Sequence, residues 1–215
     1  MANTNNAKSG RFVTPIFRAS YAQVYELAAD KLNPQRAPTC SVTMIFDKKT
    51  TDFTGLKNLI KEAIAKGKDT KWGGVVPPAN KLKIPLRDGS EKSQDGYGPD
   101  TIFAAARCYC VPQVLAADGK TLLSTEAEFG SGDYARATIT AKPFNQNGNV
   151  GVRFELGNIQ KVKDGPRFNG SRPAEDEFDA LEQPADGLSG ETGEAPAGTA
   201  AAPAQNDDPL AGLGV

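Results

Sequence analysis

The sequence predicts a mainly β domain, a five-stranded barrel with one α-helix and long loops, followed by a disordered acidic tail. Apolar and polar residues alternate along Cys40–Phe46, Ile102–Val111 and Tyr134–Lys163, which is the period of a half-buried β-strand. Charge is split along the chain. Residues 1–172 contain 25 Lys and Arg against 16 Asp and Glu, whereas residues 173–215 contain ten acidic residues and no basic one. Such a split is typical of a polyanion-binding body with an acidic tail.

The stretch Tyr134–Lys163 predicts a β-hairpin. Small apolar residues, among them Ala135 and Ile139, alternate with basic and aromatic residues in its first half. The turn segment Asn145–Asn149 (NQNGN) supplies residues that tolerate positive φ. The basic and aromatic face could hold a polyanion that carries exposed bases, although an ordinary amphipathic hairpin with a solvated face would show the same pattern.

Three other strands and a helix complete the expected domain. Arg11–Arg18 predicts a strand with an edge or bend at Pro15, and the alternating segments near Cys40 and Ile102 predict two more. A helix capped by Thr50 or Thr51 should run to about Lys66, because one apolar stripe follows the cap and Gly67 follows the stripe.

Five strands with glycine-rich connections suit an OB-fold-like barrel. We expect the domain to span residues 10–172. Residues 1–9 and 173–215 should be disordered, because neither segment can bury enough apolar surface to offset the entropy of ordering.

A long basic stretch, Lys66–Lys92, separates the helix from the next strand. Trp72 lies among its lysines. Loops of this length inside a domain are usually functional or disordered. Basic residues with an interleaved aromatic suit a groove that follows a nucleic-acid backbone, and a floppy solvated insertion is the alternative.

Catalysis and metal binding are disfavoured. The chain has no histidine, the commonest general base and metal ligand. Cys40, Cys108 and Cys110 are too few for a tetrahedral zinc site, so we expect three small buried hydrophobic residues, with no metal and no cofactor. The polar N-terminus and the lack of a run of about 20 apolar residues predict a protein that is neither secreted nor membrane-bound.

Four segments resemble tailed-phage single-stranded-DNA-binding proteins: Thr70–Lys92, Phe129–Val152, Gly157–Gly165 and Arg172–Phe178. The resemblance implies an OB-fold protein with an acidic C-terminal tail and no catalytic residues. It also implies cooperative or filament-like coverage of single-stranded DNA during phage replication and recombination, in the cytoplasm of the bacterial host.

We therefore predict sequence-independent binding of single-stranded DNA, with aromatic residues stacking on bases and basic residues contacting phosphates. The predicted DNA-binding residues are Phe17, Arg18, Tyr21, Lys71, Trp72, Lys81, Lys83, Arg87, Tyr109, Tyr134, Arg136, Lys142, Phe144 and Arg153. The tail should dock replication and recombination proteins through Glu175, Asp176, Glu177, Phe178, Asp179, Asp207 and Asp208.

Two other functions remain open from the residues. One is a replisome adaptor or DNA-mimicking inhibitor that acts through the acidic tail. The other is a carboxylate-dependent metal nuclease, which is weaker because Asp88, Glu91, Asp95 and Asp100 lie too near basic residues to make a convincing metal cage.

Overall fold

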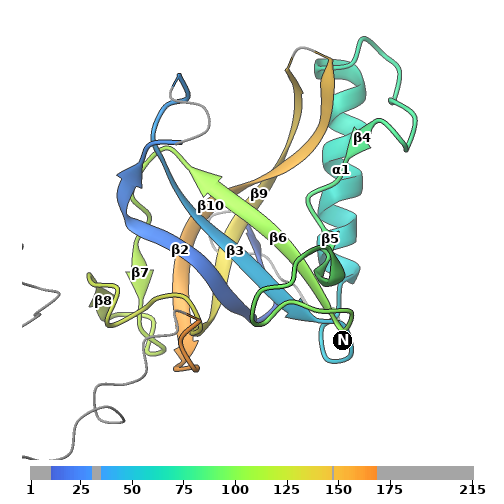
Figure 1. The fold of residues 1–215 in the computed structure, drawn as a ribbon. Helices are drawn as coiled ribbons and strands as arrows, with labels where there is room; N and C mark the ends of the chain where they lie inside the picture. The colour runs from blue at the N-terminus through green and yellow to red at the C-terminus, as the bar shows by residue number, and fades with distance from the viewer. Residues whose placement is uncertain (1–10, 31–34, 147, 169–215) are drawn as a thin grey trace, which may run out of the picture. The chain divides into compact units, whose positions relative to one another are not determined.

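The computed structural model describes residues 11–30, 35–146 and 148–168, and within them it is mainly β with one α-helix (Figure 1). The elements are β1 Phe12–Val13, β2 Phe17–Ala28, β3 Thr39–Asp47, α1 Thr54–Thr70, β4 Leu82–Lys83, β5 Arg87–Asp88, the 3₁₀ turn η1 Gly89–Glu91, β6 Thr101–Cys108, β7 Val114–Leu115, β8 Leu122–Leu123, β9 Tyr134–Gln146 and β10 Asn149–Lys163. The segments 1–9 and 173–215, predicted to be disordered, lie outside the described residues.

The longest strands pair in a cycle. β9 pairs with β2, β2 with β3, β3 with β6, β6 with β10, and β10 returns to β9. Four of these pairings are antiparallel, and β6 and β10 run parallel, with Ala106 opposite Phe154. Each strand of the cycle therefore has a neighbour on both sides, and one sheet surface faces inward.

The predicted hairpin is confirmed as β9 and β10. Ala135, Ala137 and Ile139 are buried, whereas Arg136 and Lys142 on the opposite face are exposed. The turn falls at Gln146–Asn149, inside the predicted segment, and Gly148 has φ of 78° there. The alternation of the sequence and the burial of the strand agree from Tyr134 to Ile139.

The core fills the inside of the cycle. Phe46 is fully buried in it and makes edge-on contacts with Phe17 and Phe53, with 5.9 Å between ring centroids in both pairs. Leu56 and Ile60 add the buried face of α1, which lies beside the hairpin in Figure 1. Phe17 was predicted to stack on DNA bases, and that prediction is wrong because its side chain is only 1% exposed.

The N-terminal strand is broken where Pro15 predicted a bend, into β1 and β2. β2 then continues to Ala28, well beyond the predicted end. Its pairing with β3 shifts register between Ser20 and Gln23 and again before Ala28, so its sequence lacks the clean alternation that marks a strand.

The helix begins later and ends later than predicted. Neither Thr50 nor Thr51 caps it, because both lie in the turn after β3, where their backbone N–H groups donate to the carboxylate and the carbonyl of Asp47 respectively. Phe53 takes the N-cap position without a side-chain hydrogen bond. The helix runs through Gly67 to Thr70 because this glycine serves packing. A Cβ there would lie 2.7 Å from the Trp72 ring and 2.8 Å from the Cβ of Pro143.

The cysteine prediction holds for two of the three residues. Cys40 and Cys108 are buried opposite each other on β3 and β6, and burial raises the pKa of the Cys108 thiol to about 11. Cys110 is exposed, because β6 ends at Cys108 and the chain leaves the sheet there.

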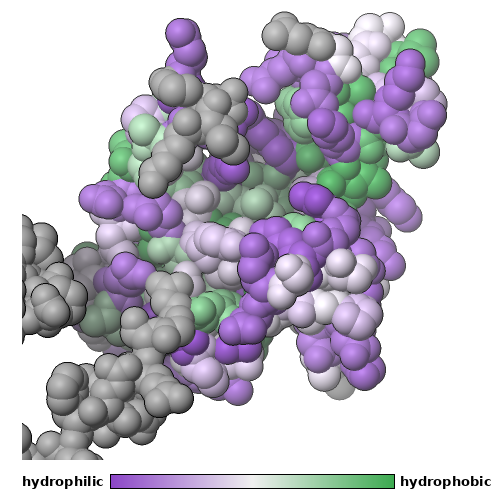
Figure 2. Space-filling view, viewed as in Figure 1, coloured by the Kyte–Doolittle hydropathy of each residue, from purple (hydrophilic) through white to green (hydrophobic). Residues whose placement is uncertain are grey.

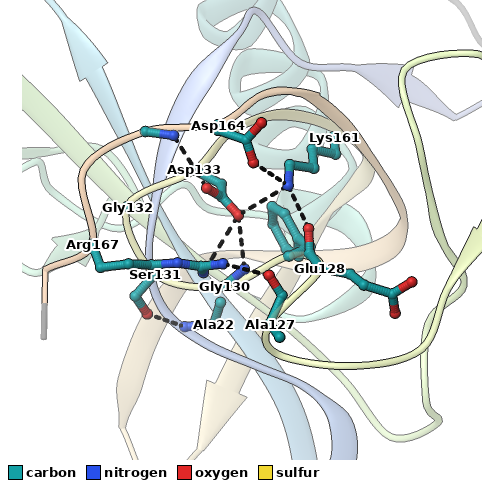
Figure 3. Close-up of polar contacts among 12 residues, drawn as sticks. Ala22, Ala127, Glu128, Gly130, Ser131, Gly132, Asp133, Lys161, Asp164 and Arg167 are labelled. Atoms are coloured by element: carbon teal, nitrogen blue, oxygen red, sulfur yellow. Dashed lines mark hydrogen bonds and ion pairs between the residues drawn. The ribbon is translucent and has the colours of Figure 1, made fainter. Parts of the chain in front are cut away.

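One buried carboxylate ties the end of the hairpin to the loop before it (Figure 3). Asp133 is 1% exposed and accepts hydrogen bonds from the backbone N–H groups of Gly130 and Gly165. The same carboxylate pairs with Lys161 at 3.6 Å and Arg167 at 3.4 Å. Both carboxylate oxygens are therefore satisfied, as a charge at this depth requires.

Gly67→Ala should destabilise the domain, although alanine is normally better than glycine in a helix by about 1 kcal/mol. The new methyl group would push against Trp72 and Pro143, and overpacking of this kind costs about 1–3 kcal/mol. Urea unfolding measures the loss, and the single tryptophan reports the displaced ring by its fluorescence. Lys68→Ala, on the exposed face of the same helix, is the control. A more stable variant with unchanged emission would contradict this packing.

Asp133→Asn should lower the free energy of unfolding by roughly 3 kcal/mol, the low end of the cost of breaking a buried ion pair. The low end applies because Lys161 keeps Asp164, at 2.6 Å, as a second partner. Asp164→Asn is the matched control, since its side chain is 89% exposed and its removal should change little. Equal unfolding midpoints for the two variants would show that the buried carboxylate has no special role.

Candidate nucleic-acid interface

A groove of about 440 Å³ lies on the outer surface of β6 and β10. β6 forms its floor by strand alternation. Ala104 and Ala106 point into the core, so Ala105 and Arg107 point outward, and the small side chain of Ala105 leaves room above the strand. The rest of the lining comes from residues 83–87 and from the tip of the β9–β10 hairpin, with which β4 is paired.

The groove is basic and partly aromatic. Five cationic side chains line it against the single carboxylate of Glu155: these are Arg36, Lys83, Arg87, Arg107 and Arg153. Tyr109, which is 54% exposed, and Phe144 also line it. Hydrophilic side chains dominate the side of the molecule seen in Figure 2, and hydrophobic surface gathers over α1 and the segment that follows it.

The segment that carries Arg87 is held in place from both sides. The Arg87 guanidinium donates to Glu91 and lies over the Phe103 ring at 5.1 Å. The next residue, Asp88, pairs with Lys48 at 2.6 Å, and the hydrogen bonds from Lys48 and Ser90 hold the pKa of Asp88 well below its usual range. A cation oriented by fixed neighbours loses less entropy when a phosphate binds it.

Basic surface continues around the hairpin tip. A second hollow of about 340 Å³ shares Phe144 and Arg153 with the groove and adds Lys71 and Lys142. Lys142 lies directly across the strands from Arg153, and its ammonium lies 3.7 Å from Glu155. Cations from the helix end, the hairpin and β6 therefore follow one another along one surface.

The structure brings together about half of the predicted DNA-binding residues. Lys83, Arg87, Tyr109, Phe144 and Arg153 line the groove, and Lys71 and Lys142 line the adjoining hollow.

Other predicted residues lie elsewhere or serve the fold. Arg18 donates to the carbonyls of Gly132 and Pro166. Trp72 packs on Gly67, and its indole N–H donates to the carbonyl of Phe144 at 3.1 Å, so it positions the hairpin wall of the groove.

The remaining predicted residues are set apart from the groove. Tyr134 and Arg136 lie at the other end of β9 from Phe144, beneath Lys163 and beside Gln160 respectively. Lys81 is exposed but does not line the groove, and Tyr21 lines a separate hollow. The predicted tail residues lie outside the described residues.

Sequence reasoning missed two cationic groove residues, Arg36 and Arg107, and the ring of Phe103. Arg107 and Phe103 lie on the same strand face as Tyr109, and the alternation of the sequence already placed them together. Arg36 had no such signal, because it lies in the loop before β3 and reaches the groove only through the fold.

Clusters of His, Cys, Asp and Glu that could hold a metal ion are absent from the described part of the chain. Its one helix is too short and too polar to cross a membrane. What the surface offers is an open, positively charged track with aromatic side chains, which defines a nucleic-acid-binding class of protein.

Comparison with known proteins narrows that class. Residues 11–188 match the family defined by the single-stranded DNA-binding protein of Enterobacter phage Enc34, and the chain belongs to this family. The family resemblance expected from the sequence is thus confirmed. A search of curated proteins found no match.

Solved structures share the fold. The single-stranded DNA-binding protein of bacteriophage Enc34 superposes with a TM-score of 0.58 at 21% identity, over 80% of this chain and 92% of that one. The same Enc34 protein in complex with single-stranded DNA gives 0.60 at 20%, over 75% and 90%. The single-stranded DNA-binding protein gp2.5 of bacteriophage T7 gives 0.53 at 16%, over 75% and 96%.

Proposed function

We propose that this protein binds single-stranded DNA without sequence preference and protects and organises it during phage DNA replication and recombination. The observation that carries the proposal is the groove, which five cationic side chains line together with the rings of Tyr109 and Phe144, above a strand where Ala105 leaves room. The family and the Enc34 complex with single-stranded DNA support it. The protein would act by binding alone.

We also infer that the strand cycle is an OB-type barrel. In chain order its strands are β2, β3, β6, β9 and β10. OB folds bind oligonucleotides on the face of their second and third strands and with the loops after the first and fourth. Here the groove uses β6, Arg36 from the loop after β2, and the turn after β9, which are the corresponding places.

The groove would tell single strands from duplex by access to the bases. Phosphates would contact Arg107, Arg153 and Lys83, while exposed bases would stack on Tyr109 and Phe144. Stacking contributes about 1–3 kcal/mol per base and accepts any base, because every base has a π face. A duplex keeps its bases stacked inside and could use only the charges.

Arg107→Ala combined with Arg153→Ala should weaken oligo-dT binding and reduce the log–log salt slope by about 1.4, because each lost phosphate contact on a single strand removes about 0.7. Fluorescence anisotropy at several salt concentrations measures both quantities. Lys57→Ala with Lys61→Ala, two exposed cations on α1, is the control with the same loss of charge. A wild-type slope near zero, or equal affinity for duplex and single strands, would refute the proposed function.

In this proposal the acidic tail docks replication and recombination proteins in the cytoplasm of the bacterial host. Copies of this protein associate with one another along the DNA. The tail's ten acidic residues carry no compensating base. A flexible tether would keep them near the basic domain at an effective concentration in the millimolar range, so that DNA and tail compete.

Ending the chain after Pro173 should tighten oligo-dT binding, most at low salt because salt screens the tail's attraction to the groove. The same truncation should abolish recruitment of replication proteins in a pull-down, with Phe178→Ala as the test of the aromatic anchor. Unchanged oligo-dT affinity at low ionic strength would eliminate the competition and leave only the docking role.

A further inference from the structure

Tyr21 lies outside the groove in an unusual backbone conformation. It is the one non-glycine residue with positive φ in the described chain, at 48°, and its side chain is 55% exposed. The conformation falls at the register shift of β2 between Ser20 and Gln23. A bulge of this kind redirects a side chain, and Ser131 fixes it by accepting a hydrogen bond from the backbone N–H of Ala22. The positive φ of Tyr21 is energetically unfavourable, and the fold maintains it with a large ring turned outward.

Three aromatic rings surround the ammonium group of Lys92. Its Nζ lies 4.9 Å from the ring centroid of Tyr21, 4.6 Å from that of Tyr97 and 4.9 Å from that of Phe103. Tyr97 is held by its hydroxyl, which donates to Ser20 Oγ at 3.0 Å, and by an edge-on contact with Phe103. These four residues are called the aromatic box below.

The cation in the box has no acidic partner among the described residues. Lys92 makes no ion pair with a carboxylate there, whereas Lys48 and Lys142 each make one and Lys161 makes two. Burial, together with the nearby charge of Arg87, lowers the pKa of Lys92. An anion beside Lys92 would relieve both effects, because it would add the missing opposite charge.

A hollow of about 340 Å³ opens beside the box, within the size range of small-ligand sites. Its aromatic lining is Tyr21, Tyr97 and Phe168, and its polar lining includes Ser93, Gln94 and Asp95. Flat apolar faces next to hydrogen-bonding groups match an unpaired base, which offers a π face for stacking and a polar edge.

The box continues from the groove. Phe103 lines the groove and also faces Lys92, and the Arg87 guanidinium covers the same ring. A strand that leaves the groove past Arg87 would therefore reach Lys92 next.

We propose that the aromatic box and its hollow form a second nucleotide subsite, in which one unpaired base stacks on Tyr21 and Tyr97 and Lys92 contacts the adjoining phosphate. The proposal rests on the proposed function and extends it. It assigns the path of the strand beyond the groove, to Tyr21, Lys92 and Tyr97, which the groove does not contain, and it gives the outward turn of Tyr21 a purpose.

The decisive variant is Tyr21→Gly. Glycine removes the ring and also adopts positive φ without cost, so a purely structural role and a binding role give different results. We expect an unfolding temperature equal to or above that of the wild type, and a loss of about 5- to 150-fold in affinity for long oligo-dT, as removal of one stacking platform predicts. Short oligo-dT that fills only the groove should bind as before.

Anisotropy with a ladder of oligo-dT lengths measures this dependence on length. Leu122→Ala, which removes a 53% exposed side chain from β8, is the control and should change neither length class. Tyr21→Phe, which keeps the ring, should retain wild-type affinity. The subsite is overturned if Tyr21→Gly binds long oligo-dT with the affinity of the wild type. It is also overturned if the variant loses the same affinity at every oligo-dT length.

A second variant covers the case in which Tyr21→Gly disturbs the fold. Lys92→Met keeps an unbranched chain among the rings and removes only the charge. The salt slope for long oligo-dT should fall by about 0.7, and the slope for short oligo-dT should stay. An unchanged slope overturns the phosphate contact. If the wild type itself fails to bind oligo-dT, the proposed function is refuted. If the wild type binds and both variants bind equally well, only the second subsite is refuted.

Discussion

The antiparallel pairing of β9 with β10 is the interaction on which the rest of the structure depends. It closes the strand cycle, because β9 returns to β2 and β10 returns to β6. Its register sets Ile139 opposite Leu156 in the core and Arg153 opposite Lys142 on the surface. A slip by one residue would exchange the two faces, burying charged side chains and exposing apolar ones, so the core itself holds the cations in the binding surface.

The groove separates the tasks of holding and selecting a ligand. Guanidinium and ammonium groups attract any phosphate backbone, whereas aromatic rings stabilise only bases that are free to stack. Neither kind of contact reads base identity, since base-edge hydrogen bonds are not required. Fixed contacts such as Arg87 with Glu91, and the indole hydrogen bond of Trp72 to the hairpin, keep this surface shaped before a ligand arrives.

The sequence predicted those parts of the fold whose signal is local. The hairpin, β3 and β6 follow from alternation, and the helix follows from one apolar stripe. The part of β2 beyond Arg18 escaped prediction because its bulges break the alternation. The helix start was misplaced because Thr50 lies in the turn after β3, where its N–H donates to the Asp47 carboxylate, and the helix begins only after Phe53. Phe17 and Arg18 were predicted to be a base-stacking ring and a phosphate-binding cation. The side chain of Phe17 is buried instead, and Arg18 donates its hydrogen bonds to backbone carbonyls, which the local sequence pattern does not reveal.

Residues of the candidate site were predictable where they share a strand face and hidden where the fold brings distant loops together. Tyr109 marked the exposed face of β6, and Arg107 could have been added from the same alternation. Arg36, Lys92 and Tyr97 lie in connections without periodicity, and their positions depend on contacts with elements far away in the chain.

The parallel pairing of β6 with β10 affects the order in which the chain can fold during synthesis. β10 is the last strand of the cycle in chain order, and it supplies Arg153 to the groove and a partner to both β6 and β9. During synthesis the sheet formed by the earlier strands keeps two unpaired edges, at β6 and β9, until residue 163 has emerged from the ribosome. Pairings between such distant segments form slowly. A nascent chain therefore has exposed strand edges at β6 and β9 until β10 pairs with both, and the groove is incomplete before that pairing because Arg153 lies on β10.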